Sequence, residues 1–374
     1  MKRLVLVGGG HAHAFVLERL ARARLTDTEV LLIAPAARQI YSGMLPGWIA
    51  GAYPLDACTL PLDRLAARAG VRFVQQACVR LDAAQRTIEC ADGRAVAWDW
   101  LSLDVGSASA GQDIPGAAQH ATPVRPLERF VERLARLLDE AAAGTAGDIV
   151  IIGGGAAGVE LAFALEARLA ALGRRAHAPI GLTVVDARTR PPAGLPRLLQ
   201  WRAAALLRAR GITWLGGQQV AAIGGNGVGL ADGRRLPARH VLQISGAAAQ
   251  PWLAASGLAT DAQGFVRVGP TLQSVSHPRV FAAGDCATYA VPRPRSGVFA
   301  VRAGPPLAAN LLRALAGEPL HAWRPQRTAL YLVSAGAGHA LAAWGPLVWW
   351  GEWVWRWKDR IDRAFVARFN RPAD

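Results

Sequence analysis

Cysteine is scarce in this sequence. Its 374 residues include four cysteines and no C-x-x-C pair, which excludes a disulfide-dense scaffold and a thioredoxin-like or zinc site of that spacing. The four are Cys58, Cys78, Cys90 and Cys286. This usage is typical of a reducing compartment, so we expect a cytoplasmic protein.

Long apolar runs are also missing. No run approaches the ~18 residues that a membrane-spanning helix needs. The apolar stretch at residues 4–7 leads directly into a glycine turn and is far shorter than the core of a signal peptide. We therefore expect neither a spanning helix nor a secretion signal.

Lysine is nearly absent, although the formal net charge is +15. Only Lys2 and Lys358 are lysines, and the other basic residues are arginines spread along the chain. No dense basic stretch with interleaved aromatic residues occurs in residues 1–340, so we do not expect a nucleic-acid partner. Arginine suits diphosphates because its guanidinium binds them in a bidentate manner, and an anionic membrane surface is another partner that this charge allows.

Two glycine-rich turns are present, each directly after a short aliphatic strand. The first, at residues 8–13, reads Gly-Gly-Gly-His-Ala-His and precedes a helical pattern. In the dinucleotide-binding fingerprint, Gly8 would permit the tight turn and Gly10 would let the backbone approach a diphosphate at the helix N-terminus. The turn therefore predicts a dinucleotide site, in a chain long enough for two or three domains.

The first turn departs from that fingerprint at two positions. His13 replaces the third glycine, which predicts looser packing of the helix on its strand. Ala34 ends the next strand, where an acidic residue normally binds the ribose, and Arg38 could take over part of that contact. A metal site at His11 and His13 is disfavoured, because residues two apart on a helix point in different directions.

The second turn has the complete fingerprint, with Gly153, Gly155 and Gly158 between a buried strand and an amphipathic helix. The following strand ends in Asp186, whose carboxylate suits a ribose 2′-hydroxyl and repels a 2′-phosphate. NADH is therefore favoured over NADPH. The nearby Arg188 leaves NADPH open, because an arginine after this strand can hold the phosphate.

A third signal lies at residues 280–285, a strand that ends in Gly284 and Asp285. Beyond a polar loop, the segment 297–306 leads through two prolines into a helix that we expect to end near Leu315. The positive N-terminal end of such a helix would favour the anion of a reduced flavin.

Together these motifs resemble the FAD-dependent pyridine nucleotide-disulfide oxidoreductase superfamily over roughly residues 1–320. The resemblance implies that Asp285 holds the ribityl chain of FAD, and that strands ending near Gly106 and Gly246 connect the two nucleotide domains. It also implies two sets of cofactor contacts. The FAD set is Gly8, Gly10, His11, Ala12, Arg38, Gly106, Gly284, Asp285, Gly297 and Val298; the NAD(P)H set is Gly153, Gly155, Gly158, Asp186 and Gly246.

Within the superfamily the chain looks most like the type II NADH:quinone oxidoreductase branch, and nearest to the oxidoreductase domain found fused to selenide, water dikinase. The motifs that carry this resemblance are residues 8–13, 41–47, 325–327 and 355–362. No kinase domain is present here. Disulfide reductases of the superfamily carry C-x-x-x-x-C early in the flavin domain, where this chain reads Tyr-Ser-Gly-Met-Leu-Pro at 41–46.

Direct hydride transfer from NAD(P)H to FAD, without a redox disulfide, is therefore the expected chemistry. Tyr41 and Pro46 are expected to line the substrate face of the flavin. Glu160, at the start of the second nucleotide helix, has two open interpretations: a role toward the flavin and nicotinamide, or a first-turn residue that complements the helix dipole. Electrons would pass to a quinone or another small acceptor.

Tryptophan is concentrated near the C-terminus, with six residues between Trp344 and Trp357. On a helix, one apolar face would hold Trp350, Trp353, Trp357, Ile361, Phe365 and Phe369. One interpretation of 345–369 is a peripheral membrane contact on the inner face of the cytoplasmic membrane. The other is a helix packed on the flavin domain or at a homodimer contact.

The sequence thus predicts an α/β protein with two Rossmann-like, three-layer domains. A discontinuous FAD domain would cover 1–112 and 247–320, with an NAD(P)H domain inserted at 113–246. An α+β cap with the amphipathic helix would cover 321–374. Two alternative functions stay open: an FAD-dependent oxidoreductase for a soluble selenium, sulfur or other metabolite, and a degenerate flavin fold that serves as a binding or regulatory module.

Overall fold

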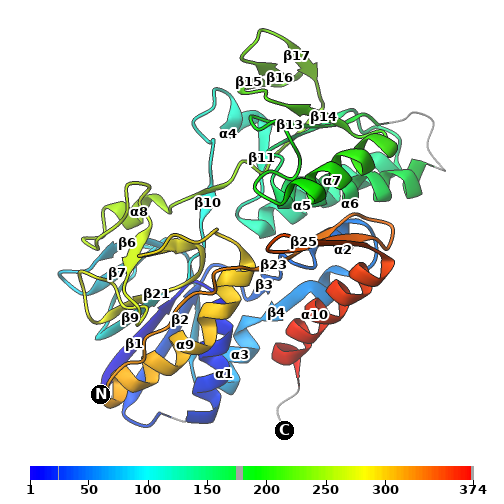
Figure 1. Cartoon of the computed structure of the whole chain (residues 1–374). Coiled ribbons are helices and arrows are strands. Elements are labelled where there is room, and N and C mark those ends of the chain that lie inside the picture. Colours follow the sequence, from blue (N-terminus) through cyan, green and yellow to red (C-terminus); the bar gives the residue numbers. More distant parts are fainter. Residues whose placement is uncertain (24, 174–179, 372–374) are drawn as a thin grey trace.

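Two five-stranded parallel sheets form the centre of the computed structural model, which describes residues 1–23, 25–173 and 180–371 (Figure 1). The first sheet has the order β21 (Val280–Ala282), β9 (Trp100–Leu103), β1 (Lys2–Val7), β2 (Thr28–Ala34), β5 (Arg72–Gln75). The second has the order β11 (Ala121–Pro123), β18 (His240–Gln243), β12 (Ile149–Ile152), β13 (Leu182–Asp186), β14 (Thr213–Gly216).

The second sheet is inserted into the first along the chain. Its strands lie in sequence between β9 and β21, which are neighbours in the first sheet. The chain crosses between the sheets twice, and the two crossing segments pair with each other as β10 (Ala108–Ser109) and β19 (Ala247–Ala248). This is the insertion that the sequence predicts; the exact domain boundaries stay a prediction.

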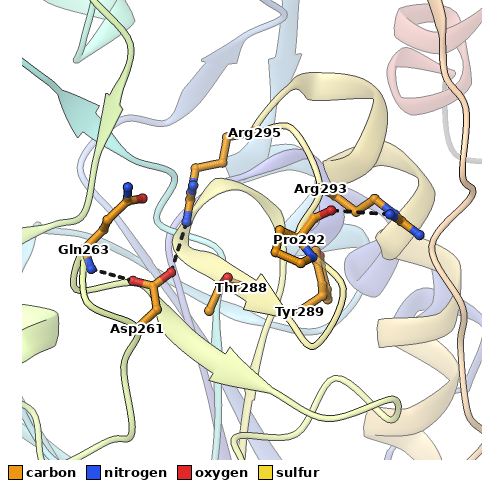
Figure 2. A pocket seen from close by; sticks show the side chains of 8 residues that line it. Asp261, Gln263, Thr288, Tyr289, Pro292, Arg293 and Arg295 are labelled. Carbon is orange, nitrogen blue, oxygen red and sulfur yellow. Dashed lines mark hydrogen bonds and ion pairs between the residues drawn. The ribbon is translucent and has the colours of Figure 1, made fainter.

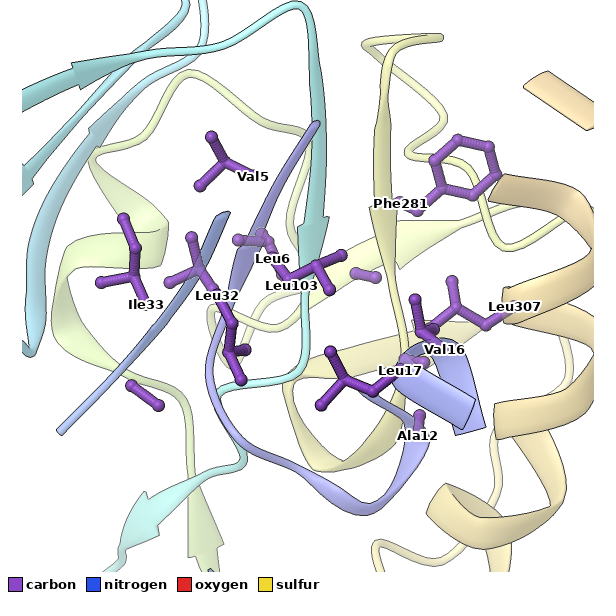
Figure 3. Close-up of a cluster of buried hydrophobic side chains, with 14 of the residues drawn as sticks. Val5, Leu6, Ala12, Val16, Leu17, Leu32, Ile33, Leu103, Phe281 and Leu307 are labelled. Atoms are coloured by element: carbon purple, nitrogen blue, oxygen red, sulfur yellow. The ribbon is translucent and has the colours of Figure 1, made fainter. Parts of the chain in front are cut away.

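Buried aliphatic side chains explain why the strands form where they do. Strand β1 is completely buried over its last four residues, as expected for a parallel strand covered on both faces. Its side chains pack against α1 (His11–Ala23) and α9 (Gly297–Ala316), and Figure 3 shows Leu6, Val16 and Leu307 in this cluster. The second sheet is covered by α5 (Leu127–Ala142), α6 (Ala156–Gly173) and α7 (Arg197–Ala209).

Helix α9 begins earlier than predicted. It starts at Gly297, so Pro305 and Pro306 lie inside the helix and not at its start. Upstream of the prolines the segment is small and apolar and packs closely on α1, since a Cβ on Gly304 would lie 2.3 Å from the Phe15 ring. That packing outweighs the two backbone hydrogen bonds that the prolines remove.

In each half of the chain a small three-stranded antiparallel meander precedes the last strand before the chain crosses to the other sheet, β9 in the first half and β18 in the second. The meanders are β6 (Cys78–Asp82), β7 (Thr87–Cys90), β8 (Ala95–Ala97), and β15 (Val220–Gly224), β16 (Gly227–Leu230), β17 (Arg235–Pro237). The remaining short elements are β3 (Arg38–Ile40), α2 (Leu45–Ile49), η1 (Leu55–Cys58), β4 (Thr59–Pro61), α3 (Leu62–Arg68), α4 (Ala117–His120), α8 (Pro251–Ala254), β20 (Val266–Val268), η2 (Gly284–Cys286) and β22 (Ala287–Tyr289).

The C-terminal segment forms an antiparallel sheet followed by a long helix. The sheet contains β23 (Leu330–Ser334), β24 (Ala340–Trp344) and β25 (Leu347–Gly351), and α10 (Glu352–Asn370) follows it. Helix α10 packs on the first sheet's layer of helices, with Phe369 edge-on to Phe15 at 5.1 Å between ring centroids. Within the described residues, no helix has the length and apolar character needed to cross a membrane.

The buried face of α10 differs from the predicted apolar face. Phe369 is buried as expected, but Trp353 and Ile361 are 49% and 40% exposed. The buried positions include Lys358 and Asp362, two charged residues one turn apart. Apolar periodicity failed here because the buried stripe includes an ion pair.

Candidate functional site

One large cleft opens between the two sheets and the C-terminal segment. Its volume is about 1940 Å³, and residues from both glycine turns, β23 and α10 line it. Carboxyl ends of parallel strands meet at one edge of a sheet, and both sheets turn that edge toward the cleft. The predicted site residues that line it are Gly8, Gly10, His11, Arg38, Tyr41, Pro46, Gly106, Gly153, Gly155, Gly158, Glu160, Asp186, Gly246, Asp285, Gly297 and Val298.

Two predicted contact residues do not line the cleft. Ala12 is completely buried in the core between α1 and the first sheet. Gly284 has a φ of +70°, and a Cβ there would lie 2.5 Å from Asp104 Oδ1. Neither residue is among those that line the cleft.

The first glycine turn is held by the end of β9. Gly8 has a φ of +95°, and a Cβ would lie 2.3 Å from the Asp104 carbonyl oxygen. A Cβ on Gly10 would lie 2.2 Å from the Asp104 carboxyl group. Glycine is thus required at both positions by close packing against one residue.

His13 carries a Cβ where the second turn has no room for one, so α1 cannot approach its strand as closely as α6 does, in line with the looser packing predicted. The His13 ring is completely buried and occupies the space between helix and turn. Nδ1 lies 2.7 Å from the Gly8 carbonyl oxygen, and Nε2 lies 2.9 Å from Ser102 Oγ. Burial lowers the pKa of His13 to about 4, so the ring is neutral and its bonds join α1 to the turn and to β9.

Asp104 is a buried carboxyl group at the cleft side of the first turn that sequence reasoning did not identify. It accepts the backbone N–H of His13 at 3.0 Å, and burial raises its pKa to about 7. Ile244 occupies the matching position at the second turn. Its backbone N–H donates to the Ile152 carbonyl oxygen of β12, as the N–H of Asp104 donates to the Val7 carbonyl oxygen of β1. A comparison of the two halves of the chain could have revealed this charged substitution.

The second glycine turn has room for a ligand. Gly153 has a φ of +109°, and a Cβ on Gly158 would lie 1.8 Å from the Gly153 carbonyl oxygen. A Cβ on Gly155, in contrast, would meet no atom within 4 Å. Gly158 therefore permits close packing of helix on strand, and Gly155 leaves open space in the cleft at the start of α6, where a diphosphate fits.

Asp186 is buried beside this turn, where it accepts the Gly154 N–H at 2.6 Å. Arg188 folds back onto it, with Nε 3.0 Å from Asp186 Oδ1. Burial raises the pKa of Asp186, but the bonds from Arg188 and Gly154 outweigh it and hold the pKa below its usual value. The carboxylate and the guanidinium thus both lie at the ribose end of the second site, paired with each other.

The side of the cleft near the first turn contains many unpaired polar atoms. Among the residues that the structure describes, six that line the cleft have a buried nitrogen or oxygen atom without a hydrogen-bond partner. They are His11, Gln39, Ser107, Arg125, Arg295 and Ser296. Unpaired buried groups are costly, so this lining fits a large polar ligand such as a flavin dinucleotide.

Asp285 lies at this side with its carboxylate engaged from the other sheet. Arg125, which follows β11, donates from Nη2 to Asp285 Oδ2 at 2.8 Å. Arg38 also lines the cleft, but its side chain is exposed to solvent and forms an ion pair with Asp56 at 2.8 Å. The neighbouring Cys286 is completely buried, and burial raises its pKa to about 12, which disfavours the reactive thiolate.

A second, small pocket lies beside the cleft (Figure 2). It measures about 240 Å³ and shares with the cleft only Arg295, among the residues described. Arg295 pairs there with Asp261 at 3.4 Å. The charges of Arg295 and Asp261 largely cancel in this pair, and the pocket has a much smaller volume than the cleft. The cleft is therefore the main candidate site.

Charged groups collect where α10 and β23 close the cleft. Glu160 Oε1 accepts the Ser334 N–H at 2.7 Å, and burial raises the pKa of Glu160 to about 7. Lys358 and Asp362 form a buried ion pair at 2.6 Å, and Tyr41 donates its hydroxyl to Asp362 at 3.1 Å. Sequence reasoning named Tyr41 and Glu160 but missed Lys358 and Asp362, whose spacing of four was the available signal.

Comparison with known proteins identifies the family. Residues 2–304 match the model of the pyridine nucleotide-disulphide oxidoreductase family. The chain belongs to this family. It is 30% identical to an NADH dehydrogenase-like protein of Mycobacterium tuberculosis, over 90% of this chain and 87% of the relative. It is 26% identical to the demethylphylloquinone reductase of Synechocystis, over 92% of this chain and 87% of the relative.

Solved structures show the same fold. The sulfide:quinone oxidoreductase of Aquifex aeolicus superimposes with a TM-score of 0.80 at 18% identity, covering 99% of this chain and 91% of the other. NDH2 of Plasmodium falciparum, in complex with NADH, gives 0.79 at 14% identity and covers 99% of both. The predicted family, its NDH2-like branch and the fold class are confirmed, and the protein is a flavin-dependent NAD(P)H oxidoreductase.

Gly155 and Gly158 of the second turn should respond differently to substitution. Gly158→Ala should destabilise the protein by about 1–3 kcal/mol, because its Cβ meets the Gly153 carbonyl oxygen. Gly155→Val should change the free energy of unfolding by less than about 0.5 kcal/mol, because its side chain enters open space. It should nevertheless weaken NADH binding at least about tenfold, a cost of about 1.4 kcal/mol. Urea unfolding and fluorescence titration with NADH measure the two effects; unimpaired NADH binding by Gly155→Val would contradict this assignment.

Proposed function

We propose that this protein oxidises NADH, holds FAD as its resident cofactor and passes electrons to a quinone. The observation that carries the proposal is the single cleft into which both glycine turns and the charged cluster of Tyr41, Glu160, Lys358 and Asp362 open. FAD bound there would supply hydride and electron transfer, chemistry that no side chain of the cleft provides.

The proposed FAD site is the part of the cleft near the first turn. Its unpaired polar atoms and the Asp285 carboxylate suit the ribityl chain, the diphosphate and the flavin ring edge. Gly10 and the start of α1 would receive the diphosphate, and Gly297 with Val298 begins α9 at the same side. The Asp104 carboxyl group, which lines the cleft and accepts the His13 N–H there, would have to give up this bond to the diphosphate, while His13 holds the turn through its bond to Gly8.

The acceptor would enter where α10 and β23 close the cleft. Pro46 and other apolar residues line this end, which suits a quinone ring. Reduction of a quinone to a quinol also consumes protons. Glu160, with a pKa of about 7, and the ammonium group of Lys358 are the buried groups that can donate them.

The optical spectrum of the purified protein tests this function. It should show flavin absorption that bleaches when NADH is added without oxygen and returns on addition of a soluble quinone. Release of the cofactor and chromatography then distinguish FAD from FMN. Protein that stays colourless after incubation with FAD would instead favour the binding or regulatory module. Rapid reoxidation by a soluble selenium or sulfur metabolite, with none by quinones, would favour the specialised oxidoreductase.

Nucleotide preference should depend on Asp186 and Arg188. We propose NADH as the natural donor, because a buried carboxylate at the ribose site repels a 2′-phosphate. Asp186→Ala should raise KM for NADH about tenfold or more and lower KM for NADPH, since it removes the repulsion and releases Arg188. Arg188→Ala serves as the paired control and should not improve NADPH. Steady-state kinetics with both nucleotides measure this, and a wild-type preference for NADPH would refute it.

The apolar surface near the acceptor end suggests where the protein acts. We propose that it is a cytoplasmic protein that binds peripherally to the inner face of the membrane through a tail patch, defined as Trp344, Leu347, Trp350, Trp353 and Ile361. All five side chains are at least 40% exposed, and Ile361 also lines the cleft. Tryptophan suits the headgroup region, and contact there would bring a lipid-soluble quinone to the cleft.

Vesicle sedimentation tests the tail patch. Wild-type protein should bind vesicles that contain phosphatidylglycerol, and Trp353→Ser with Ile361→Ser should weaken binding about tenfold or more. Val275→Ser is the control, because Val275 is 55% exposed and lies outside the tail patch, between β20 and β21. Unchanged vesicle binding by the double variant would refute the membrane proposal. Loss of a dimer in sedimentation velocity would show that the patch is a homodimer contact instead.

A further inference from the structure

Two tyrosine–aspartate pairs connect α10 to the first part of the chain. Tyr53 donates its hydroxyl to Asp359 at 2.5 Å, and Tyr41 donates to Asp362 at 3.1 Å. Each pair joins a tyrosine of the first part of the chain to an aspartate of α10. They differ in location, since Tyr41 and Asp362 line the cleft whereas Tyr53 and Asp359 are not among its lining residues.

Lys358 distinguishes the inner pair further. Its side chain is 9% exposed, and Nζ donates to Asp362 Oδ2 and to the Gly43 carbonyl oxygen, each at 2.6 Å. An ammonium group has three N–H bonds. In the described part of the chain the third has no hydrogen-bond partner, and Lys358 lines the cleft. The two bonds therefore fix the ammonium group and leave one donor for a ligand.

Asp362 is the common partner in this arrangement. One carboxylate oxygen receives the Tyr41 hydroxyl and the other receives the ammonium of Lys358. A buried ion pair is weak evidence for stability, because desolvation of two charges offsets much of their attraction. Its place at the acceptor end of the cleft points to a function instead.

We propose that Asp362 is a positioning residue for reduction of the acceptor: it holds Lys358 and Tyr41 so that the free N–H of Lys358 protonates a carbonyl oxygen of the quinone. This inference rests on the proposed function. Overall, NADH, one proton and a quinone give NAD⁺ and a quinol. Of the two hydrogens of the quinol, one derives from the hydride of NADH. The other is the solvent proton, which reaches the second oxygen from Lys358; Lys358 regains a proton from Glu160, which is reprotonated from solvent.

The groups around Lys358 agree with this role. Burial alone would lower its pKa, but the carboxylates of Asp362, Glu160 and, more weakly, Asp359 raise it above its usual value. These face Lys358 from α10 and α6, and the Tyr41 hydroxyl lies on the far side of Asp362. Removal of the Asp362 charge should therefore lower the pKa of Lys358 more than removal of the Asp359 charge.

The lysine content of the chain allows a direct measurement without cofactor or quinone. Lys2 and Lys358 are the only lysines, so protein labelled with [¹³Cε]lysine gives two NMR signals. The Lys358 signal should titrate at a pH at least about one unit lower in Asp362→Asn than in wild type, a tenfold change in acid dissociation. Asp359→Asn is the matched control and should shift it less. Equal shifts in both variants, or none in Asp362→Asn, would overturn the proposal.

A choice of acceptors separates proton supply from electron flow. Ferricyanide takes electrons without protons, whereas a soluble quinone needs both. Asp362→Asn should slow NADH-driven quinone reduction about a hundredfold, which is the usual size of a lost general-acid contribution, and leave ferricyanide reduction within about twofold. The pH at which quinone reduction declines should also fall. Asp359→Asn and Tyr53→Phe should leave both rates unchanged.

Two further outcomes keep the inference distinct from the proposed function. Tyr41→Phe retains the ring and removes the hydroxyl, so it should reproduce part of the quinone defect even if Asp362→Asn does not fold. An equal loss with both acceptors would overturn the positioning role. Wild-type protein that reduces ferricyanide but no quinone would refute the proposed function, while the lysine titration would still decide whether Asp362 controls Lys358.

Discussion

The distance that each glycine turn sets between helix and strand is the constraint on which the site depends. In the second turn α6 comes so near β12 that Gly158 has no room for a Cβ beside the Gly153 carbonyl oxygen. In the first turn α1 stands farther away, and the His13 ring bridges the gap with a bond to Gly8. Both solutions fix the helix N-terminus at the carboxyl edge of its sheet, where anions bind.

The two turns therefore position their helix N-termini in different ways. The second uses Gly158, and the first uses His13 together with the buried carboxyl group of Asp104. The second leaves open space at Gly155, whereas the Asp104 carboxyl group occupies the corresponding space at Gly10 in the first. The first turn thus carries a carboxyl group whose pKa burial raises to about 7, at a position that the second fills with Ile244. The two sites are alike in topology and differ by one titratable group.

The sequence was most informative where structure is local. The glycine turns, the aliphatic strands and the late Gly284–Asp285 strand were predictable because short-range periodicity and backbone conformation determine them. Family, fold class and flavin chemistry followed and are confirmed. The individual cofactor contacts, the domain boundaries and the cellular location stay predictions.

What could not be predicted depends on contacts between distant segments. Asp104 lies about ninety residues from the turn that it supports, and its hydrogen bond with His13 spans a sequence separation of 91. Tyr41 and Asp362 are 321 residues apart, and no pattern in either segment indicates that they meet. The apolar-face prediction for α10 failed for the same reason. Lys358 and Asp362 are buried because Lys358 donates to the Gly43 carbonyl oxygen and Asp362 accepts the Tyr41 hydroxyl, contacts that the sequence of α10 does not reveal.

The ion pair between Arg125 and Asp285 connects the second nucleotide domain with the proposed flavin site of the first. Arg125 follows a strand of the second sheet, and Asp285 belongs to the proposed flavin site of the first. A ligand that takes over the Asp285 carboxylate must compete with Arg125 or use it, because that guanidinium has a second nitrogen, Nη1, without a partner among the described residues. A flavin bound at the proposed site would therefore also act on the contact between the two nucleotide domains, because Arg125 takes part in both.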